Sequence, residues 1–208
     1  MSFVQREPTP SDIPSIVDAI FDAYRYHPVT GRAFIASSKH TLEYWSTSLT
    51  YDIENPNSHF LVLTDPNSSD PEGVVGFAKW DRPFDPASPP PPPPEMTWPE
   101  DGDRAFGEKF FGSVAEKRKE IMKGRRHWYL AMLGIRWDYQ GKGLGGQLLR
   151  WGLEKADADG LEVFLGSSPW GAPVYTKHGF DTVETMTFDD GKYLERFMLR
   201  PARRADER

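Results

Sequence analysis

The first eighty residues alternate between helix-like and strand-like patterns. A short strand is expected over residues 3–7, and residues 11–14 have the Ser-Asp cap and early proline of a helix start. Apolar residues then recur at helical spacing, at Ile13, Ile16, Val17, Ile20, Phe21 and Tyr24. The pair His27-Pro28 is expected to end this helix. A second helix is expected over residues 39–52, followed by an antiparallel pair of strands over residues 59–64 and 73–80.

Residues 82–126 interrupt this alternation and are interpreted as an insertion. Ser88 precedes six consecutive prolines, which have no N–H for a sheet and favour an extended polyproline II rod. A strongly charged helix is expected over residues 104–123. Acids predominate between Asp81 and Asp103, where Arg82 is the one base. We interpret residues 82–102 as a solvated linker; the alternative is an acidic wall that attracts a cation.

The second half contains a strand, loop, helix and strand in succession. Residues 128–135 are almost wholly apolar, which predicts a strand buried on both faces. A glycine-rich turn follows, and then a helix over 145–159, a strand over 161–166, a short helix over 172–178 and strands over 180–188 and 193–199. The predicted fold class is α/β with a mixed sheet, in a single domain over residues 1–208.

Composition narrows the classes of function. A formal net charge of −6, from 25 Lys and Arg against 31 Asp and Glu, argues against a nucleic-acid partner. The absence of cysteine excludes a cysteine nucleophile and any Cys-ligated metal. The five histidines show no metal-binding spacing, so no metal is expected. Without a signal-peptide pattern or an apolar run near the ~20 residues of a bilayer span, a cytoplasmic protein without membrane association is expected.

The candidate chemistry centres on residues 140–146, Gln-Gly-Lys-Gly-Leu-Gly-Gly, between the apolar strand and the next helix. Glycines let the backbone approach an anion closely, and a helix N-terminus supplies free N–H groups and a positive dipole end. The segment is therefore expected to bind phosphate. The alternative is a plain turn from strand to helix.

Three phosphate-binding patterns can be compared with this segment. A P-loop fails, because position 136 is Arg136 and no Lys-Ser or Lys-Thr follows the glycines. A dinucleotide fingerprint is met in spacing, but residues 136–140 separate it from the strand and Glu162 lies at the wrong end of the next strand. The third pattern is Gln or Arg, two residues, Gly, one residue, then Gly or Ala, and it is met by Gln140, Gly143 and Gly145.

At these residues the sequence resembles the GNAT superfamily of acetyl-CoA-dependent N-acyltransferases. The matching segments are residues 133–135, 139–145, 148–149, 165–168 and 175–180. The resemblance is strong over about residues 127–190 and lies only in the order of elements over 1–80. It is closest to a small-molecule or uncharacterised branch common in fungi and bacteria. It implies the GNAT fold, in which the strand at 128–135 splays from the strand at 161–166 and acetyl-CoA lies in the V-shaped cleft.

The resemblance also implies the cofactor-binding residues. The pyrophosphate would lie on backbone N–H groups of Gln140, Gly141, Lys142, Gly143, Leu144, Gly145 and Gly146. The pantetheine arm would pair with the backbone of Leu133, Gly134 and Ile135. The side chains expected beside the cofactor are those of Lys142, Ser168, Tyr175 and Lys177.

Acetyl transfer to an amine requires a neutral amine, a stabilised oxyanion and a proton for the departing thiolate. Without cysteine, direct attack in a ternary complex is expected. The backbone N–H of Ile135 or a neighbour is expected to hold the oxyanion, and Tyr175 to be the acid, unless it is simply a packing tyrosine. The base stays open, because the strand at 128–135 has no carboxylate. The candidates are a water chain, Asp81, Glu95, His127, Asp189 and Asp190.

The expected function is an N-acetyltransferase for a primary amine of a small or flexible acceptor, in a monomer or homodimer. Trp80, Asp81 and Phe84 are expected to contact this acceptor, in an aromatic wall that Trp98 and Phe106 would extend. The alternative is a non-catalytic acyl-CoA-binding or sensor protein on the same fold. It is motivated by the missing carboxylate.

Overall fold

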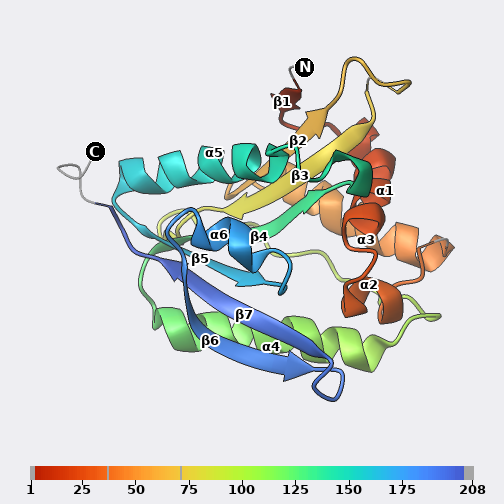
Figure 1. Ribbon diagram of the computed structural model, residues 1–208. Helices are drawn as coiled ribbons and strands as arrows, with labels where there is room; N and C mark the ends of the chain where they lie inside the picture. Colours follow the sequence, from red (N-terminus) through yellow and green to blue (C-terminus); the bar gives the residue numbers. More distant parts are fainter. Residues whose placement is uncertain (1–2, 37, 71, 204–208) are drawn as a thin grey trace.

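The computed structural model describes residues 3–36, 38–70 and 72–203. Seven strands form one sheet in the order β1-β2-β3-β4-β5-β7-β6 (Figure 1). The strands are β1 (Val4–Arg6), β2 (Ser58–Thr64), β3 (Val74–Asp81), β4 (His127–Ile135), β5 (Glu162–Ser167), β6 (Asp181–Phe188) and β7 (Tyr193–Arg200). The helices are α1 (Ile13–Ala23), α2 (Pro28–Arg32), α3 (Lys39–Glu54), α4 (Arg104–Met122), α5 (Leu144–Asp159) and α6 (Ala172–Thr176), with 3-10 turns η1 (Pro10–Asp12) and η2 (Trp137–Tyr139). The predicted mixed α/β fold is confirmed.

Helix α2 is the element that the sequence did not predict. The pair His27-Pro28 was expected only to stop a helix, but it also starts one. His27 is the N-cap, where its ring accepts a hydrogen bond from the N–H of Val29, and Pro28 occupies the first helical position. Proline is favoured there because its missing N–H has no partner in a helix anyway. Helix α1 ends at Ala23, and the pair His27-Pro28 starts α2 four residues later.

Strands β4 and β5 form the parallel pair of the sheet, and they separate about halfway along β4. Their pairing runs only from His127 opposite Glu162 to Leu130 opposite Leu165. Beyond Leu130, β4 continues to Ile135 with β3 as its partner on one side only. This is the splay that the resemblance implied, and we call the opening between the two strands the mouth.

A β-bulge in β4 lies at the start of the mouth. Trp80 of β3 pairs with Leu130 and Lys79 pairs with Met132, so Ala131 is the extra residue. An extra residue bends the strand and interrupts its alternation of faces. As a result Leu130 and Leu133 both face α5, although they are three residues apart.

The expectation that β4 is buried on both faces is wrong for its middle. Ala131, Met132 and Leu133 are only partly buried. Strand β4 pairs with β3 along its length but with β5 only as far as Leu130. Because β5 diverges there, these three residues border an opening.

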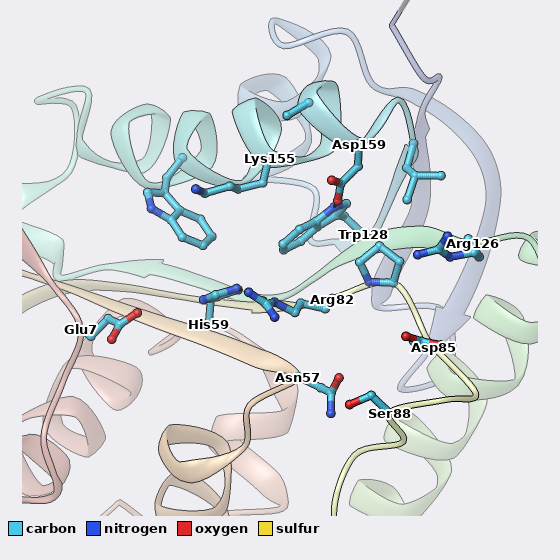
Figure 2. A pocket seen from close by; sticks show the side chains of 14 residues that line it. Glu7, Asn57, His59, Arg82, Asp85, Ser88, Arg126, Trp128, Lys155 and Asp159 are labelled. Carbon is cyan, nitrogen blue, oxygen red and sulfur yellow. Dashed lines mark hydrogen bonds between the residues drawn. The ribbon is translucent and has the colours of Figure 1, made fainter.

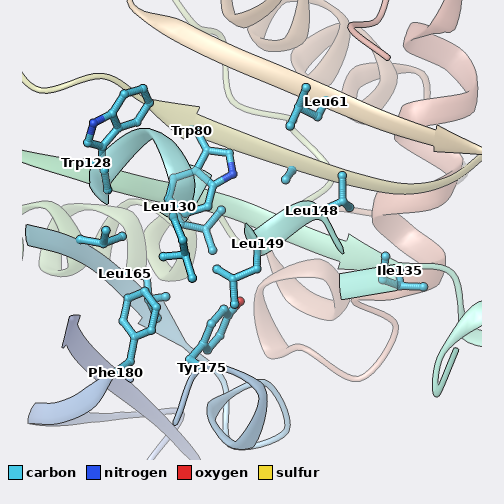
Figure 3. Packing of buried hydrophobic residues seen from close by; sticks show 14 of the residues in the cluster. Leu61, Trp80, Trp128, Leu130, Ile135, Leu148, Leu149, Leu165, Tyr175 and Phe180 are labelled. Carbon is cyan, nitrogen blue, oxygen red and sulfur yellow. The ribbon is translucent and has the colours of Figure 1, made fainter. Parts of the chain in front are cut away.

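Helices cover both faces of the sheet (Figure 1). One face carries α5 and α6, whose apolar residues pack with the strands in one cluster; Figure 3 shows this cluster around Trp80, Leu148, Leu149 and Tyr175. The opposite face carries α1, α2, α3 and α4, and its core includes Ile16, Ile20, Phe34, Phe77, Phe106, Phe110 and Tyr193. The mouth is therefore bordered by α5 and α6 on one face of the sheet and by the other helices on the opposite face.

The segment expected as a linker is only partly solvated. Residues 84–93 are exposed, as expected. Trp98, however, stacks on Phe34 with ring centroids 5.7 Å apart, and the hydroxyl of Tyr51 donates to the carbonyl of Pro91 at 2.7 Å. The helix that follows, α4, contributes Phe106 to the core. Residues 82–126 therefore cover the second face of the sheet as well as connecting β3 to β4.

Close packing between α5 and β3 yields a stability prediction. A Cβ at Gly152 would lie 2.2 Å from Cε2 of Trp80, which is fully buried. We expect Gly152→Ala to lower the free energy of unfolding by about 1–3 kcal/mol through overpacking, although alanine favours a helix over glycine by about 1 kcal/mol. Urea denaturation of the variant and the wild type measures this.

Gly112 is the matched control, since it is also inside a helix but has open space around its Cβ position. Gly112→Ala is expected to raise the free energy of unfolding by up to about 1 kcal/mol. Equal shifts in the two variants would show that Trp80 does not constrain α5.

Candidate active site

The glycine loop lies at the end of β4, where the mouth is widest. Gly141 and Gly143 have φ angles of 74° and 79°, a left-handed conformation that glycine adopts without a steric penalty. The side-chain amide of Gln140 donates to the carbonyl of Ile135 at 3.1 Å. This bond ties the loop back to the end of the strand.

The loop presents a row of free backbone donors. Within the described parts of the chain, the N–H groups of Gly141, Lys142 and Gly143 have no hydrogen-bond acceptor. Helix α5 starts directly afterwards, and the N–H groups of its first turn have no partner inside the helix. Together with the positive end of the helix dipole, these donors form an anion-binding surface. The loop residues expected from the sequence thus lie together, whereas Lys177 is exposed just beyond α6.

Leu133 presents both of its backbone polar groups to the mouth. The hydroxyl of Tyr24, at the end of α1, donates to the carbonyl of Leu133 at 2.9 Å and accepts from its N–H at 3.2 Å. Because backbone groups alternate along a strand, the N–H of Ile135 points to the same side. A chain with amide groups lying in the mouth would find donors and acceptors here once Tyr24 moves aside.

Gly134 has a packing reason to be glycine. A Cβ there would lie 2.4 Å from Cζ of Phe77 and 3.0 Å from Cβ of Ala23. Gly145 faces the opposite side, where its Cβ position is 3.5 Å from a methyl group of Leu133. The backbone of β4 is therefore closely covered on the α1 side and approached by the loop on the α5 side.

Tyr175 lies in α6, on the α5 side of the mouth. It is buried, and its ring contacts Phe180 with centroids 5.9 Å apart (Figure 3). Its hydroxyl has no hydrogen-bond partner among the described residues. Burial, and to a smaller extent the charge of Glu195, raises the pKa of Tyr175, so the phenol keeps its proton at neutral pH. Ser168, expected beside it, accepts a hydrogen bond from the N–H of Gly171 and so helps to hold the turn before α6.

The structure does not assemble the expected acceptor wall, and the prediction for Trp80 needs correction. Trp80 is fully buried beneath α5, because adjacent residues of a strand point to opposite faces and Lys79 and Asp81 take the other one. Asp81 lies 3.7 Å from the Lys79 ammonium. Phe84 is 62% exposed, and Trp98 belongs to the cluster around Phe34.

The residues considered as a base are engaged elsewhere or exposed. His127 begins β4, at the other end of the strand from Ile135, and accepts a hydrogen bond from Arg118 at 2.9 Å. Asp189 is ion-paired with Arg32 at 2.7 Å. Glu95 and Asp190 are exposed.

Two buried residues, Tyr193 and Glu195, and the half-buried His27 lie together near the mouth, and the sequence patterns did not single them out. Glu195, in β7, is 4% exposed, and its carboxyl lies against Gly166, where a Cβ would be only 2.5 Å from Oε1. Tyr193 donates to Oε2 of Glu195 at 2.7 Å. Nε2 of His27 lies 2.7 Å from the same tyrosine hydroxyl. The sequence signal was a carboxylate sharing the inward face of a strand with Tyr193 and Phe197.

The direction of this hydrogen-bond chain follows from its ends. Nδ1 of His27 accepts from the N–H of Val29 at 3.2 Å, so the ring proton is on Nε2. The Tyr193 hydroxyl uses its own proton toward Glu195 and therefore accepts from Nε2 of His27. Burial lowers the pKa of His27 to about 4, which keeps the ring neutral. The donors thus run from His27 through Tyr193 to Glu195.

The pKa of Glu195 is raised into the neutral range. Burial raises its pKa to about 7, and the hydrogen bond from Tyr193 and the charge of Arg196 oppose that rise. A carboxyl with such a pKa can take up and release a proton under physiological conditions.

A separate pocket of about 800 Å³ lies at the far end of the sheet from the glycine loop (Figure 2). Trp128 and His59 stack in it with centroids 5.9 Å apart, and Arg82 donates to His59 at 2.8 Å. None of the mouth residues lines it. Because its charged groups are exposed and of both signs, we place the candidate chemistry at the mouth.

The described residues include no group of three or more His, Asp or Glu side chains arranged to hold a metal ion. None of their helices is long and apolar enough to cross a bilayer.

The chain matches known acetyltransferases in sequence and in fold. Residues 106–195 match the family described as Acetyltransferase (GNAT) domain, so the match begins inside α4 and ends in β7. A solved structure from Corynebacterium glutamicum, described as histone acetyltransferase HPA2 and related acetyltransferase, has a TM-score of 0.62 at 23% identity over 98% of each chain.

Two other solved structures share the fold at lower identity. PaiA N-acetyltransferase from Thermoplasma acidophilum, in complex with coenzyme A, has a TM-score of 0.54 at 14% identity and covers 97% of this chain and 99% of its own. Ribosomal-protein-S18-alanine N-acetyltransferase from Escherichia coli has a TM-score of 0.56 at 15% identity and covers 98% and 96%. At identities this low, the structural similarity shows a common fold and no more.

The raised pKa of Glu195 predicts a pH-dependent stability. Between its ordinary pKa of 4.5 and about 7, the folded chain holds a proton that the unfolded chain has released. The wild type should therefore lose stability as pH rises through this window, and Glu195→Gln should not. We expect the free energy of unfolding of the variant, relative to the wild type, to rise by about 2–3 kcal/mol from pH 5 to pH 8.

Urea denaturation at both pH values measures this difference, since the other titrating groups are common to both proteins. A difference that does not change with pH would mean that burial does not raise the pKa of Glu195.

Proposed function

We propose that the chain is an N-acetyltransferase that moves the acetyl group of acetyl-CoA to a primary amine of a small or flexible acceptor, because residues 106–195 match the GNAT acetyltransferase domain and the whole chain shares its fold with a solved acetyltransferase structure. We also propose that residues 1–208 make up one N-acetyltransferase domain. The single sheet that includes both β1 and β7 supports this.

The observation that carries the proposal is the combination of free donors in the loop and an edge of β4 that has no neighbouring strand, where Tyr24 occupies the backbone groups of Leu133. The N–H groups of Gly141, Lys142 and Gly143, with those of the first turn of α5, suit the pyrophosphate of coenzyme A. The edge of β4 at Leu133 and Ile135 suits the amide groups of the pantetheine arm. The two features adjoin, which a ligand with a diphosphate at one end and an amide-bearing chain at the other requires.

The reaction proposed is direct attack of the amine on the thioester. The chain has no cysteine to carry an acetyl group. We assign the oxyanion to the N–H of Ile135, which points into the mouth. We assign the proton for the departing thiolate to Tyr175, whose hydroxyl is protonated and has no partner among the described residues.

The first test is calorimetric titration of the purified protein with acetyl-CoA, with NAD and ATP as controls. Saturable binding selective for acetyl-CoA, followed by release of free CoA with at least one member of an amine panel, is expected. Binding without CoA release would favour a non-catalytic acyl-CoA sensor. No binding to the folded protein would overturn the proposal.

A substitution in the glycine loop tests the phosphate site. We expect Gly143→Glu to weaken acetyl-CoA binding by at least about 100-fold, or about 2.7 kcal/mol, because a side chain strains the left-handed backbone and adds a negative charge beside the pyrophosphate. The control is Gly112→Glu, an exposed helical position with open space around its Cβ. Wild-type affinity in folded Gly143→Glu would remove the loop from the site.

A substitution at Tyr175 tests the acid. Tyr175→Phe keeps the ring contact with Phe180 but removes the proton donor, so kcat should fall by about 100-fold or more while the Kd for acetyl-CoA is unchanged. Tyr44→Phe is the control, because Tyr44 is a partly buried tyrosine on the other face of the sheet. A kcat of Tyr175→Phe equal to that of the wild type across the pH range would exclude the acid role.

A further inference from the structure

We infer that Glu195 is the general base that deprotonates the acceptor amine, and that Tyr193 and His27 are positioning residues that hold its carboxylate toward the mouth. This inference rests on the proposed function and names a residue that the sequence patterns and the family match did not single out. The carboxylate that β4 lacks is supplied from β7.

The position of Glu195 follows from the register of the strands. Leu165 is the last residue of β5 that pairs with β4, so Gly166 is the first residue of β5 inside the mouth. The carboxyl of Glu195 lies against Gly166, on the face where Val114 of α4 is 3.9 Å from the same Cβ position. Glu195 therefore lies where the two strands separate, on the α4 side.

The glycine loop reaches the mouth from the opposite face. Gly145 adjoins the side chains of Leu133 and Ile135 on the α5 side of β4. A thioester held by the loop and β4 would thus enter from the α5 side, and Glu195 faces it from the α4 side. An amine between them would have its base behind it and the carbonyl carbon in front, the geometry that attack requires.

Gly166 provides the space for the carboxyl. A side chain at this position would overlap Oε1 of Glu195 at 2.5 Å, so a residue with a Cβ would displace the carboxylate from the mouth. The neighbouring strand residues Phe164 and Leu165 are fully buried and large. The glycine thus lies at the position on β5 where the carboxyl of Glu195 occupies the space of a side chain.

Oε1 is the atom free to take a proton. Tyr193 donates to Oε2, and no described residue donates to Oε1. Because Nε2 of His27 donates to Tyr193 and Nδ1 is fixed by the N–H of Val29, the tyrosine hydroxyl can turn its proton only toward Glu195. The chain therefore orients the carboxylate without competing for Oε1.

The groups around Glu195 leave it able to work near neutral pH. Burial raises its pKa to about 7, while Tyr193 and Arg196 limit the rise. Its charge is in turn felt by Tyr24 of α1, Tyr129 of β4 and Tyr175 of α6, all of which are neutral at this pH. His27 is also neutral, so Arg196 is the charged side chain acting on Glu195.

The proton balance of the step is complete with these residues. Oε1 takes one proton from the acceptor ammonium, and the neutral nitrogen forms a bond to the acetyl carbon. When the C–S bond breaks, Tyr175 gives its proton to the sulfur and regains one from the nitrogen as the amide forms. Glu195 then releases its proton to solvent, so that one proton is produced for each acetyl group transferred.

The test compares wild type, Glu195→Gln, Tyr193→Phe and the control Glu154→Gln, a substitution at an exposed residue of α5. CoA release with the best amine of the panel is followed from pH 5.5 to 9, and acetyl-CoA affinity is measured by calorimetry. Glu195→Gln should lower kcat by about 100-fold or more at pH 7.5 with unchanged acetyl-CoA affinity. The control should behave as the wild type.

The pH profile separates a lost base from a damaged fold. Wild type should show an acid limb with an apparent pKa near 7. In Glu195→Gln this limb should disappear, and the rate should instead rise about tenfold per pH unit until the amine loses its proton unaided. Tyr193→Phe removes a hydrogen bond that lowers the pKa of Glu195, so its acid limb should move to higher pH.

Two results would overturn the inference, and they differ. CoA release by wild type together with an unchanged rate and pH profile in Glu195→Gln would exclude Glu195 as the base and leave the proposed function standing. Acetyl-CoA binding without CoA release by wild type, over the whole panel, would overturn the proposed function and this inference together.

Discussion

The rest of this structure depends on one interrupted hydrogen-bond ladder. The extra residue at Ala131 bends β4 away from β5, and the parallel pairing stops at Leu130. Backbone groups without partners are costly when buried, so the unpaired edge must be satisfied by a side chain, by water or by a ligand. Tyr24 does this at Leu133. A sheet with a complete β4–β5 ladder would have no mouth and no site.

The mouth matters because it joins two faces of the sheet that are otherwise separated. Helix α5 brings the glycine loop and its free N–H groups from one face, and α6 places Tyr175 on that side. Helices α1 and α4 cover the other face, where β7 contributes Glu195. Donor and acceptor can then be bound by different layers and meet only at the gap, which suits a reaction that passes directly from one to the other.

Burial of the Glu195 carboxyl on the α4 side of the mouth costs free energy. A buried carboxylate loses hydration, and it is tolerated only with hydrogen bonds in return. Tyr193 supplies one, His27 fixes Tyr193, and the start of α2 fixes His27. Glycine at position 166 leaves room for the carboxyl. The short helix that separates α1 from α3 thus forms part of the support for the proposed base.

Sequence patterns, together with the family resemblance, predicted most of the fold and the glycine loop of the proposed site. Local composition, apolar spacing and turn residues predicted the seven strands and five of the six α-helices of the described residues, because each of these signals is local in the chain. The glycine loop was predictable for the same reason, since its residues are contiguous. The part of the proposed site that contains Glu195 was not predictable, because His27 at the start of α2 and Glu195 in β7 are far apart in the chain and are linked, through Tyr193, only in the folded structure. Trp80 was misplaced for a related reason: which face a strand residue takes depends on its pairing, which only the tertiary structure decides.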